Sequence, residues 1–226
     1  MLLCGFAIYT KLKTTMPLHL PSSGYIEAFA VIVDINGFTG MVAQSDNLIA
    51  NFVRDVLVGS IHAIEEAGGE VVGFMGDAVL GILPDAESAA QACFVIAKDL
   101  NGQCEYISKS QNDSPDCWDF APGGPSLKIG IEHGWLDVSE ISSRALGTHR
   151  LFIGNAINHA ARILNAGNGN RCLIGPSAVQ NGFSNYSLAG PYSVSGKSGE
   201  PDYEYFQLDL GDIWIEGESD DGLSYW

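Results

Sequence analysis

The chain has 226 residues, of which 46% are apolar, and this is enough for one domain with a sizeable hydrophobic core. Its 27 acidic residues against 11 basic ones give a formal charge of -16. This charge argues against nucleic acid or an anionic membrane as the main partner, because such surfaces are bound through Lys and Arg. An anionic substrate remains compatible with it if metal ions neutralise that substrate.

The termini and the cysteines indicate a cytoplasmic protein. The five cysteines are scattered, odd in number and without ligand spacing, which predicts reduced thiols. Residues 1–25 are expected to form a poorly ordered leader. Its apolar opening, residues 1–9, is far shorter than a membrane span of about 20 residues and lacks the basic residues that precede a signal-peptide core. Met16 is an alternative start. We expect one domain over residues 26–210, an acidic tail over 211–226, and no integral membrane segment.

The first half of the chain predicts a strand, a helix and a hairpin. Residues 28–33 form a continuous apolar run, typical of a strand buried on both faces. Apolar residues then recur at helical spacing, between an N-cap at Ser45 or Asp46 and a stop at Gly68-Gly69. The next elements are two short strands, over 70–75 and 78–83, joined at a tight Gly76-Asp77 turn.

The second half predicts two more helices and three more strands. In chain order, we expect a helix over about 85–108, an exposed loop over 110–126, a strand over about 127–138, a connection as far as Gly154, a helix over about 155–166, a strand over 171–175 and a last strand over 203–208. The order β-α-β-β-α-β, followed by an α/β extension, predicts an α+β fold on the ferredoxin-like split βαβ plan. Fold alone does not settle function.

Two acids stand where predicted strands end. Asp34 closes the first strand and Asp77 lies at the hairpin tip, and the two elements are neighbours in this plan. Paired carboxylates suit Mg²⁺ or Mn²⁺, which take oxygen ligands and bridge phosphates. The turn over 36–39 offers backbone N–H groups to a triphosphate. The alternative is that Asp34 caps a turn and Asp77 is an ordinary hairpin residue.

Four segments resemble, in order and spacing, the core motifs of class III adenylate and guanylate cyclases. They are DINGFT at 34–39, GGEVVGFMGDA at 68–78, LKIGIEHG at 127–134 and IGNAINHAARIL at 153–164. Each is weak alone, but the ordered set is specific and covers about residues 28–208. The resemblance implies that 26–210 is a cyclase catalytic domain, which forms a 3′,5′-cyclic monophosphate and pyrophosphate from a nucleoside triphosphate. It also implies a homodimer with head-to-tail shared active sites.

The resemblance implies a role for each matching residue. The carboxylates of Asp34 and Asp77 and the carbonyl of Ile35 would hold two divalent metal ions, Mn²⁺ or Mg²⁺. The positions that would contact phosphate are Phe38 and Thr39, Lys128 where many relatives have an Arg, and Lys197 as a stand-in for a Lys that Ser195 replaces.

Asn158 and Arg162 match the pair that acts on the transition state in the family. Asn158 would orient the ribose, and Arg162 would neutralise charge on the reacting phosphate. Their spacing of four places both on one face of the predicted helix. The alternative is a solvated helix face, although Asn is a poor choice within a helix.

The chain departs from the family at the two positions that read a purine base. Gly73 stands where purine cyclases have Lys or Glu, and Leu151 stands where they have a small polar residue. Because the catalytic set is kept while the base readers are lost, a different base is expected. The pattern is similar to that of the compact pyrimidine cyclases of the Pycsar system. This implies a uridylate or cytidylate cyclase that generates a signal in bacterial anti-phage defence.

Other residues must then contact the base, and several functions remain open. The candidates for base contact are Met75, Arg150 and His149 beside Leu151, and Asn51 and Phe52 in the first helix. Arg150 could equally be a surface charge. The sequence does not choose between UTP and CTP. The alternatives are a purine cyclase with non-standard base selection and a non-catalytic nucleotide-sensing domain, whereas the Phe74 to Asp77 hairpin does not match the diguanylate cyclase motif.

Overall fold

The computed structural model describes residues 18, 20–36, 38, 46–97, 126–145, 147–166 and 171–209. Residues 86–97, between β3 and β4, are helical. The other elements are β1 (Gly24–Asn36), α2 (Asp46–Glu66), β2 (Glu70–Met75), β3 (Ala78–Leu83), β4 (Ser126–Ser143), β5 (Gly147–Ile153), α4 (Asn155–Leu164), β6 (Arg171–Ile174), α5 (Pro176–Gln180), a 3₁₀ turn (Phe183–Asn185), β7 (Leu188–Val194) and β8 (Tyr203–Asp209).

These elements are built around one mixed sheet, and the predicted α+β class is confirmed. Its strand order is β2-β3-β1-β4-β6-β8-β7, and β5 pairs with the far end of β4. β4 and β6 run parallel, whereas the other described pairs are antiparallel. The β2–β3 hairpin has its predicted bounds, and Gly76 in its turn has φ 67°, a left-handed conformation that glycine adopts without strain.

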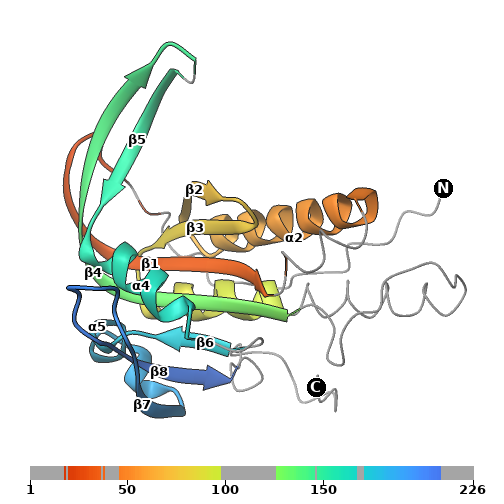
Figure 1. The fold of residues 1–226 in the computed structure, drawn as a ribbon. Helices are drawn as coiled ribbons and strands as arrows, with labels where there is room; N and C mark the ends of the chain where they lie inside the picture. The colour runs from red at the N-terminus through yellow and green to blue at the C-terminus, as the bar shows by residue number, and fades with distance from the viewer. Residues whose placement is uncertain are drawn as a thin grey trace, which may run out of the picture.

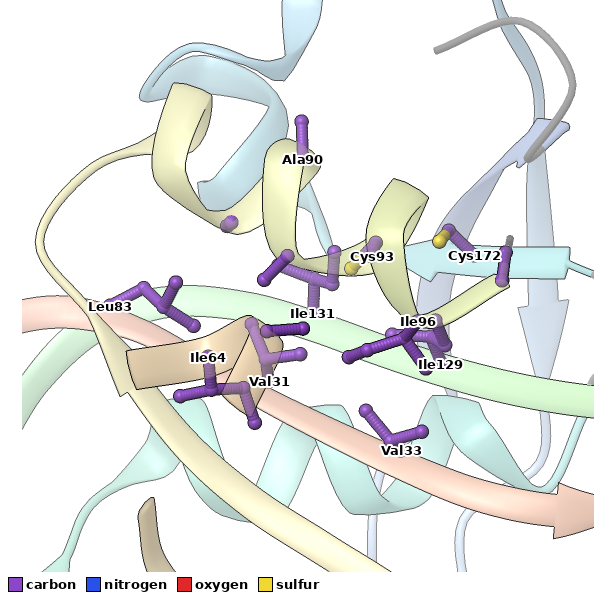
Figure 2. Close-up of a cluster of buried hydrophobic side chains, with 14 of the residues drawn as sticks. Val31, Val33, Ile64, Leu83, Ala90, Cys93, Ile96, Ile129, Ile131 and Cys172 are labelled. Atoms are coloured by element: carbon purple, nitrogen blue, oxygen red, sulfur yellow. The ribbon is translucent and has the colours of Figure 1, made fainter. Parts of the chain in front are cut away.

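The central strand β1 is buried on both faces, which explains its continuous apolar run. Val31, Val33 and Ile35 belong to the larger core, together with residues of α2 and of the helix over 86–97. Figure 2 shows part of this core, including Val31, Val33, Ile64 and Cys93. The alternate residue Ile32 packs on the opposite face against α4. Asp34 follows Ile32 by two positions and therefore lies on the α4 face.

The predicted connection between 138 and Gly154 was wrong, because it is largely strand. β4 continues to Ser143 and pairs with β5 over the register Asp137↔Ile153 to Ser143↔Gly147. Figure 1 shows the two strands extending as an arm beyond the rest of the sheet. The first strand was predicted too short, since β1 begins at Gly24, and α5, the 3₁₀ turn and β7 were not predicted.

Several expectations lie outside the described residues: the leader up to residue 17, the helix end over 98–108, the loop as far as 125 and the acidic tail. At the end of the predicted leader, Leu20 is buried and the N–H of Leu18 donates to the carbonyl of Gly68. Among the described cysteines, Cys93 and Cys172 are buried and reduced, in agreement with the predicted reduced thiols. In the described part of the chain, no helix has both the length and the apolar character needed to cross a membrane.

Candidate active site

The sheet brings Asp34 and Asp77 together. Asp34 of β1 pairs with Ala78 of β3 on one side and with Lys128 of β4 on the other. Asp77 directly precedes Ala78, so the two acidic residues are neighbours at the same end of the β1–β3 pair. The Nζ atom of Lys128 is 3.4 Å from Oδ2 of Asp34, and both side chains are largely buried.

This acidic site is short of positive charge. The pKa of Asp77 is raised above its ordinary value. Burial, the largest cause, and the charge of Asp34 raise it, whereas the backbone N–H of Asp77 and the charge of Lys128 lower it. Two carboxylates with one lysine beside them leave a negative charge when both are ionised, which fits a place for a divalent cation. Within the described ranges, no group of three or more acidic, His or Cys side chains gathers at one point. A metal here would need backbone carbonyl, water or substrate oxygens to complete its coordination.

The residues next to Asp34 contribute through the backbone. The side chain of Ile35 is buried in the larger core, which leaves its carbonyl as the group that a metal could use. Phe38 is half-buried and packs against the same core. Thr39, and the side chains of Asn51 and Phe52, lie outside the described part of the chain, so their roles stay predictions.

The second group of site residues is carried by α4. Ala156, Ala160, Ile163 and Leu164 are its buried residues, and this apolar stripe seats the helix on the sheet. The seat is close because Gly130 of β4 has no side chain: a Cβ there would be 2.5 Å from the carbonyl oxygen of Ala160. Asn158 is exposed on the outer side of the helix.

Arg162 has a partner that the sequence did not predict. Its Nη2 atom lies 2.6 Å from Oε1 of Glu200, in the turn between β7 and β8. The other oxygen of Glu200 accepts from the N–H of Lys197 at 3.2 Å and from the hydroxyl of Tyr203 at 3.4 Å. Glu200 therefore links the backbone of Lys197 to the guanidinium of Arg162. The side chain of Lys197 is exposed.

Burial would raise the pKa of Glu200, but that pKa is held below its ordinary value. The N–H of Lys197, the charge and hydrogen bond of Arg162, and the hydroxyl of Tyr203 all favour the carboxylate. The Nε atom of Arg162 is buried and has no hydrogen-bond partner among the described residues. The guanidinium is thus paired on one nitrogen and unsatisfied on another.

A buried ion pair anchors the middle of α4, and it too was not predicted. Nδ1 of His159 is 3.0 Å from Oε2 of Glu132, and its Nε2 is 3.1 Å from the carbonyl oxygen of Glu204. Burial would lower the pKa of His159, but the hydrogen bond and charge of Glu132 and the Glu204 carbonyl raise it above the ordinary value. Both ring nitrogens face an acceptor, so the fold favours the doubly protonated form of His159.

The predicted base-contacting positions have different surroundings. An added Cβ at Gly73 would meet no atom of the described residues within 4 Å. Met75 and Leu151 are exposed, as is His149. The guanidinium of Arg150 binds the carboxylate of Glu70 and the carbonyl of Leu20, which ties β5 to β2 and to the N-terminal segment. These contacts give Arg150 a structural role, which differs from both the base contact and the surface charge considered from the sequence.

The site residues therefore form two groups within one chain. Asp34 lies beside Lys128 and Asp77, at the β1 and β3 side of the sheet. Those of Arg162 lead to Glu200, at the β8 side. The motif spacing indicated both groups, but Glu132, His159 and Glu200 carried no signal beyond lying in or near the motifs.

Comparisons with known proteins identify the fold. No protein-family model matches the chain. An adenylate cyclase of Anabaena cylindrica is 31% identical over 157 residues, which cover 66% of this chain. The chain spans 29% of the length of that curated relative.

Three solved structures illustrate the structural likeness. The guanylyl cyclase Cya2 has a TM-score of 0.72 at 16% identity, over 88% of this chain and 98% of that one. The adenylyl cyclase CyaB from P. aeruginosa has a TM-score of 0.63 at 14% identity, over 82% and 94%. A class III adenylyl cyclase-like ATP-binding protein from Pseudomonas aeruginosa has a TM-score of 0.58 at 19% identity, over 70% and 35%. The chain therefore has the fold of a class III nucleotide cyclase domain.

Proposed function

We propose that this chain is a nucleotide cyclase, which forms a 3′,5′-cyclic monophosphate and pyrophosphate from a nucleoside triphosphate. The observation that carries the proposal is the pair Asp34 and Asp77, adjacent at one end of the β1–β3 pair. Lys128 offsets only part of their negative charge. In a cyclase fold, such a pair suits a metal-bound triphosphate. The partial likeness in sequence to an adenylate cyclase supports the same reaction.

Asp34, Asp77 and the Ile35 carbonyl would hold two divalent ions. Bound there, such ions supply Lewis acidity that acidifies the ribose 3′-hydroxyl and stabilises the leaving pyrophosphate. The 3′-oxygen forms a bond to the α-phosphorus, the bond from that phosphorus to the bridging oxygen breaks, and the hydroxyl proton passes to solvent. Asn158 orients the ribose and Arg162 neutralises charge on the α-phosphate, a kind of contact whose loss lowers kcat by about 10²–10³-fold.

The resemblance to cyclases supports an active site shared between two copies of the chain, arranged head to tail, and among the described residues no hydrogen bond or ion pair joins Arg162 to Asp34 or Asp77. The arm provides an apolar surface that a second copy could cover. Asp137 of β4 pairs with Tyr25 of β1 on one side and with Ile153 of β5 on the other, so these three residues share one face of the sheet. Trp135 and Leu151 lie two residues away along β4 and β5 and therefore lie on the same face. Tyr25 is 74%, Trp135 62% and Ile153 57% exposed. Contiguous exposed apolar residues of this kind mark protein interfaces.

Subunit complementation tests the shared site. Asp34→Ala and Arg162→Ala should each be inactive alone. An equal mixture should recover about a quarter of the wild-type activity, because half of the dimers are mixed and one of their two sites is intact. No recovery after verified subunit exchange would mean that each site is built within one chain.

The finer proposal is that the base is a pyrimidine, with UTP slightly favoured over CTP. Gly73 offers no polar group, and neither does the exposed Leu151, so the hydrogen bonds that select a purine have no donor or acceptor here. Incubating the protein with each of the four nucleoside triphosphates and Mn²⁺, and identifying products by mass spectrometry, tests this. Cyclic AMP or cyclic GMP without a pyrimidine product would refute the base choice and leave the cyclase proposal standing. The role in anti-phage defence stays a prediction.

Two other functions have an observation in their favour. A purine cyclase is favoured by the names of the relatives, which are adenylate, adenylyl and guanylyl cyclases. A non-catalytic nucleotide-binding domain is favoured by the structural likeness to a cyclase-like ATP-binding protein. The same product assay separates them, because nucleotide binding without any cyclic product would support the non-catalytic domain.

A further inference from the structure

Glu200 binds the guanidinium of Arg162 although the two residues are far apart in the sequence. The two residues are 38 positions apart and meet at 2.6 Å, on side chains that are 23% exposed for Arg162 and 30% for Glu200. Carboxylate and phosphate oxygens both bind the same N–H fork of a guanidinium. The N–H of Nη2 that donates to Glu200 is therefore not available to a phosphate oxygen, and the carboxylate also offsets the positive charge that would attract one.

We propose that Glu200 is the resting counter-ion of Arg162 and holds the position on the guanidinium that a substrate phosphate oxygen takes. The proposal rests on the proposed function, in which Arg162 binds the reacting phosphate. Substrate binding then exchanges one anion for another on Arg162. Glu200 acts as an internal competitor, which lowers the affinity for triphosphate while leaving the chemical step unchanged.

The geometry of the resting pair suits such an exchange. Glu200 engages one nitrogen of Arg162, and the buried Nε has no partner in the part of the chain that the structure describes. An unsatisfied buried donor is unfavourable, whereas a phosphate with several oxygens can accept from two nitrogens of the fork. Once released, Glu200 keeps two donors of its own, the N–H of Lys197 and the hydroxyl of Tyr203. Neither partner is left without a hydrogen bond when the pair opens.

Binding of inorganic triphosphate in the presence of Mg²⁺, measured by titration calorimetry, tests the exchange without turnover. Glu200→Gln keeps the shape of the side chain and removes its charge, and Glu200→Ala is the second variant if the first folds poorly. Asp202→Asn is the matched control, because Asp202 is exposed in the same turn and its substitution removes the same charge. Each substitution is also made with Arg162→Ala.

Glu200→Gln should bind triphosphate about five- to tenfold more tightly, as expected if the closed pair is populated about 80–90% of the time. Asp202→Asn should change the affinity much less, and the gain should vanish in the Arg162→Ala background. In steady state, KM for the nucleotide should fall in step with the dissociation constant while kcat stays the same.

Unchanged or weaker binding by both Glu200 variants, or an equal gain with Asp202→Asn, overturns the exchange. A fall in kcat without a gain in affinity also overturns it, and assigns Glu200 to positioning Arg162. The cyclase proposal is judged separately by the wild-type product assay, so these outcomes do not affect it. A gain that persists with Arg162→Ala likewise refutes competition at this guanidinium.

Discussion

Replacing Gly130 by Ala should lift α4 from the sheet and thereby disturb Asn158 and Arg162. A Cβ at position 130 would lie 2.5 Å from the carbonyl oxygen of Ala160 and 3.4 Å from Cβ of Leu164. The first neighbour is helix backbone, which cannot move aside by rotating a side chain. The whole helix must instead shift by about 0.9 Å to reach the 3.4 Å at which ordinary contact begins.

The expected cost follows from this shift. Overpacking of a well-packed core typically costs about 1–3 kcal/mol, and the backbone contact places this variant at the upper end. For a chain of this size, each kcal/mol lowers Tm by roughly 2–4 °C, so a fall of about 5–10 °C is expected. Misplacing catalytic groups by about 1 Å can lower the rate by about 10²-fold, so kcat should fall as well.

Gly134→Ala is the matched control, on the same strand and beneath the same helix. Its Cβ would meet Cβ of Ala156 at 3.6 Å, an ordinary contact, and the backbone at neither glycine requires a left-handed φ. Thermal melting followed by circular dichroism should show Gly134→Ala unchanged or slightly stabilised. Equal melting temperatures for the two variants would refute the seating of α4 against Gly130.

Three further predictions concern the carboxylates, His159 and the arm. Asp34→Asn and Asp77→Asn should each abolish product formation; Asp77→Asn should leave Tm unchanged or higher because two like charges no longer repel, whereas Asp34→Asn should lower Tm because Lys128 loses its partner. Retained activity in either variant would contradict the site. Because the pKa of His159 is raised in the folded chain, its contribution to stability should be complete below about pH 6.5 and be lost as pH rises through the higher folded value. His159→Gln should remove this part of the pH dependence in denaturant melts, and an unchanged profile would exclude the imidazolium. Trp135→Glu should shift the sedimentation coefficient to that of a monomer and abolish activity, whereas an unshifted dimer would exclude the arm from the interface.

Local sequence pattern was sufficient for much of the fold. The β2–β3 hairpin has its predicted bounds, and α2 begins at Asp46 as the capping signal indicated. The arm was missed because alternate residues of β5 are exposed, so an apolar core pattern is absent. β7 was missed because Gly190 and Pro191 interrupt it, and both residues usually argue against a strand.

The sequence predicted only the parts of the site that depend on local features of the chain. Asp34 and Asp77 could be placed together because a strand end and a hairpin tip are local features. The contacts to Glu200 and Glu132 join residues that are 38 and 27 positions apart, and no spacing rule connects them. The pairing of Lys128 with Asp34 depends on the register of β1 and β4, which forms only in the sheet.

The open surroundings of Gly73 affect how this protein can evolve. A Cβ installed there meets no described atom within 4 Å and needs no unusual backbone conformation, so substitution by Ala carries no evident folding penalty. If this position reads the base, nucleotide preference can change by drift through folded intermediates, without compensating mutations in the core. A saturation library at Gly73 should therefore yield mostly stable proteins, among which selection acts on substrate choice alone.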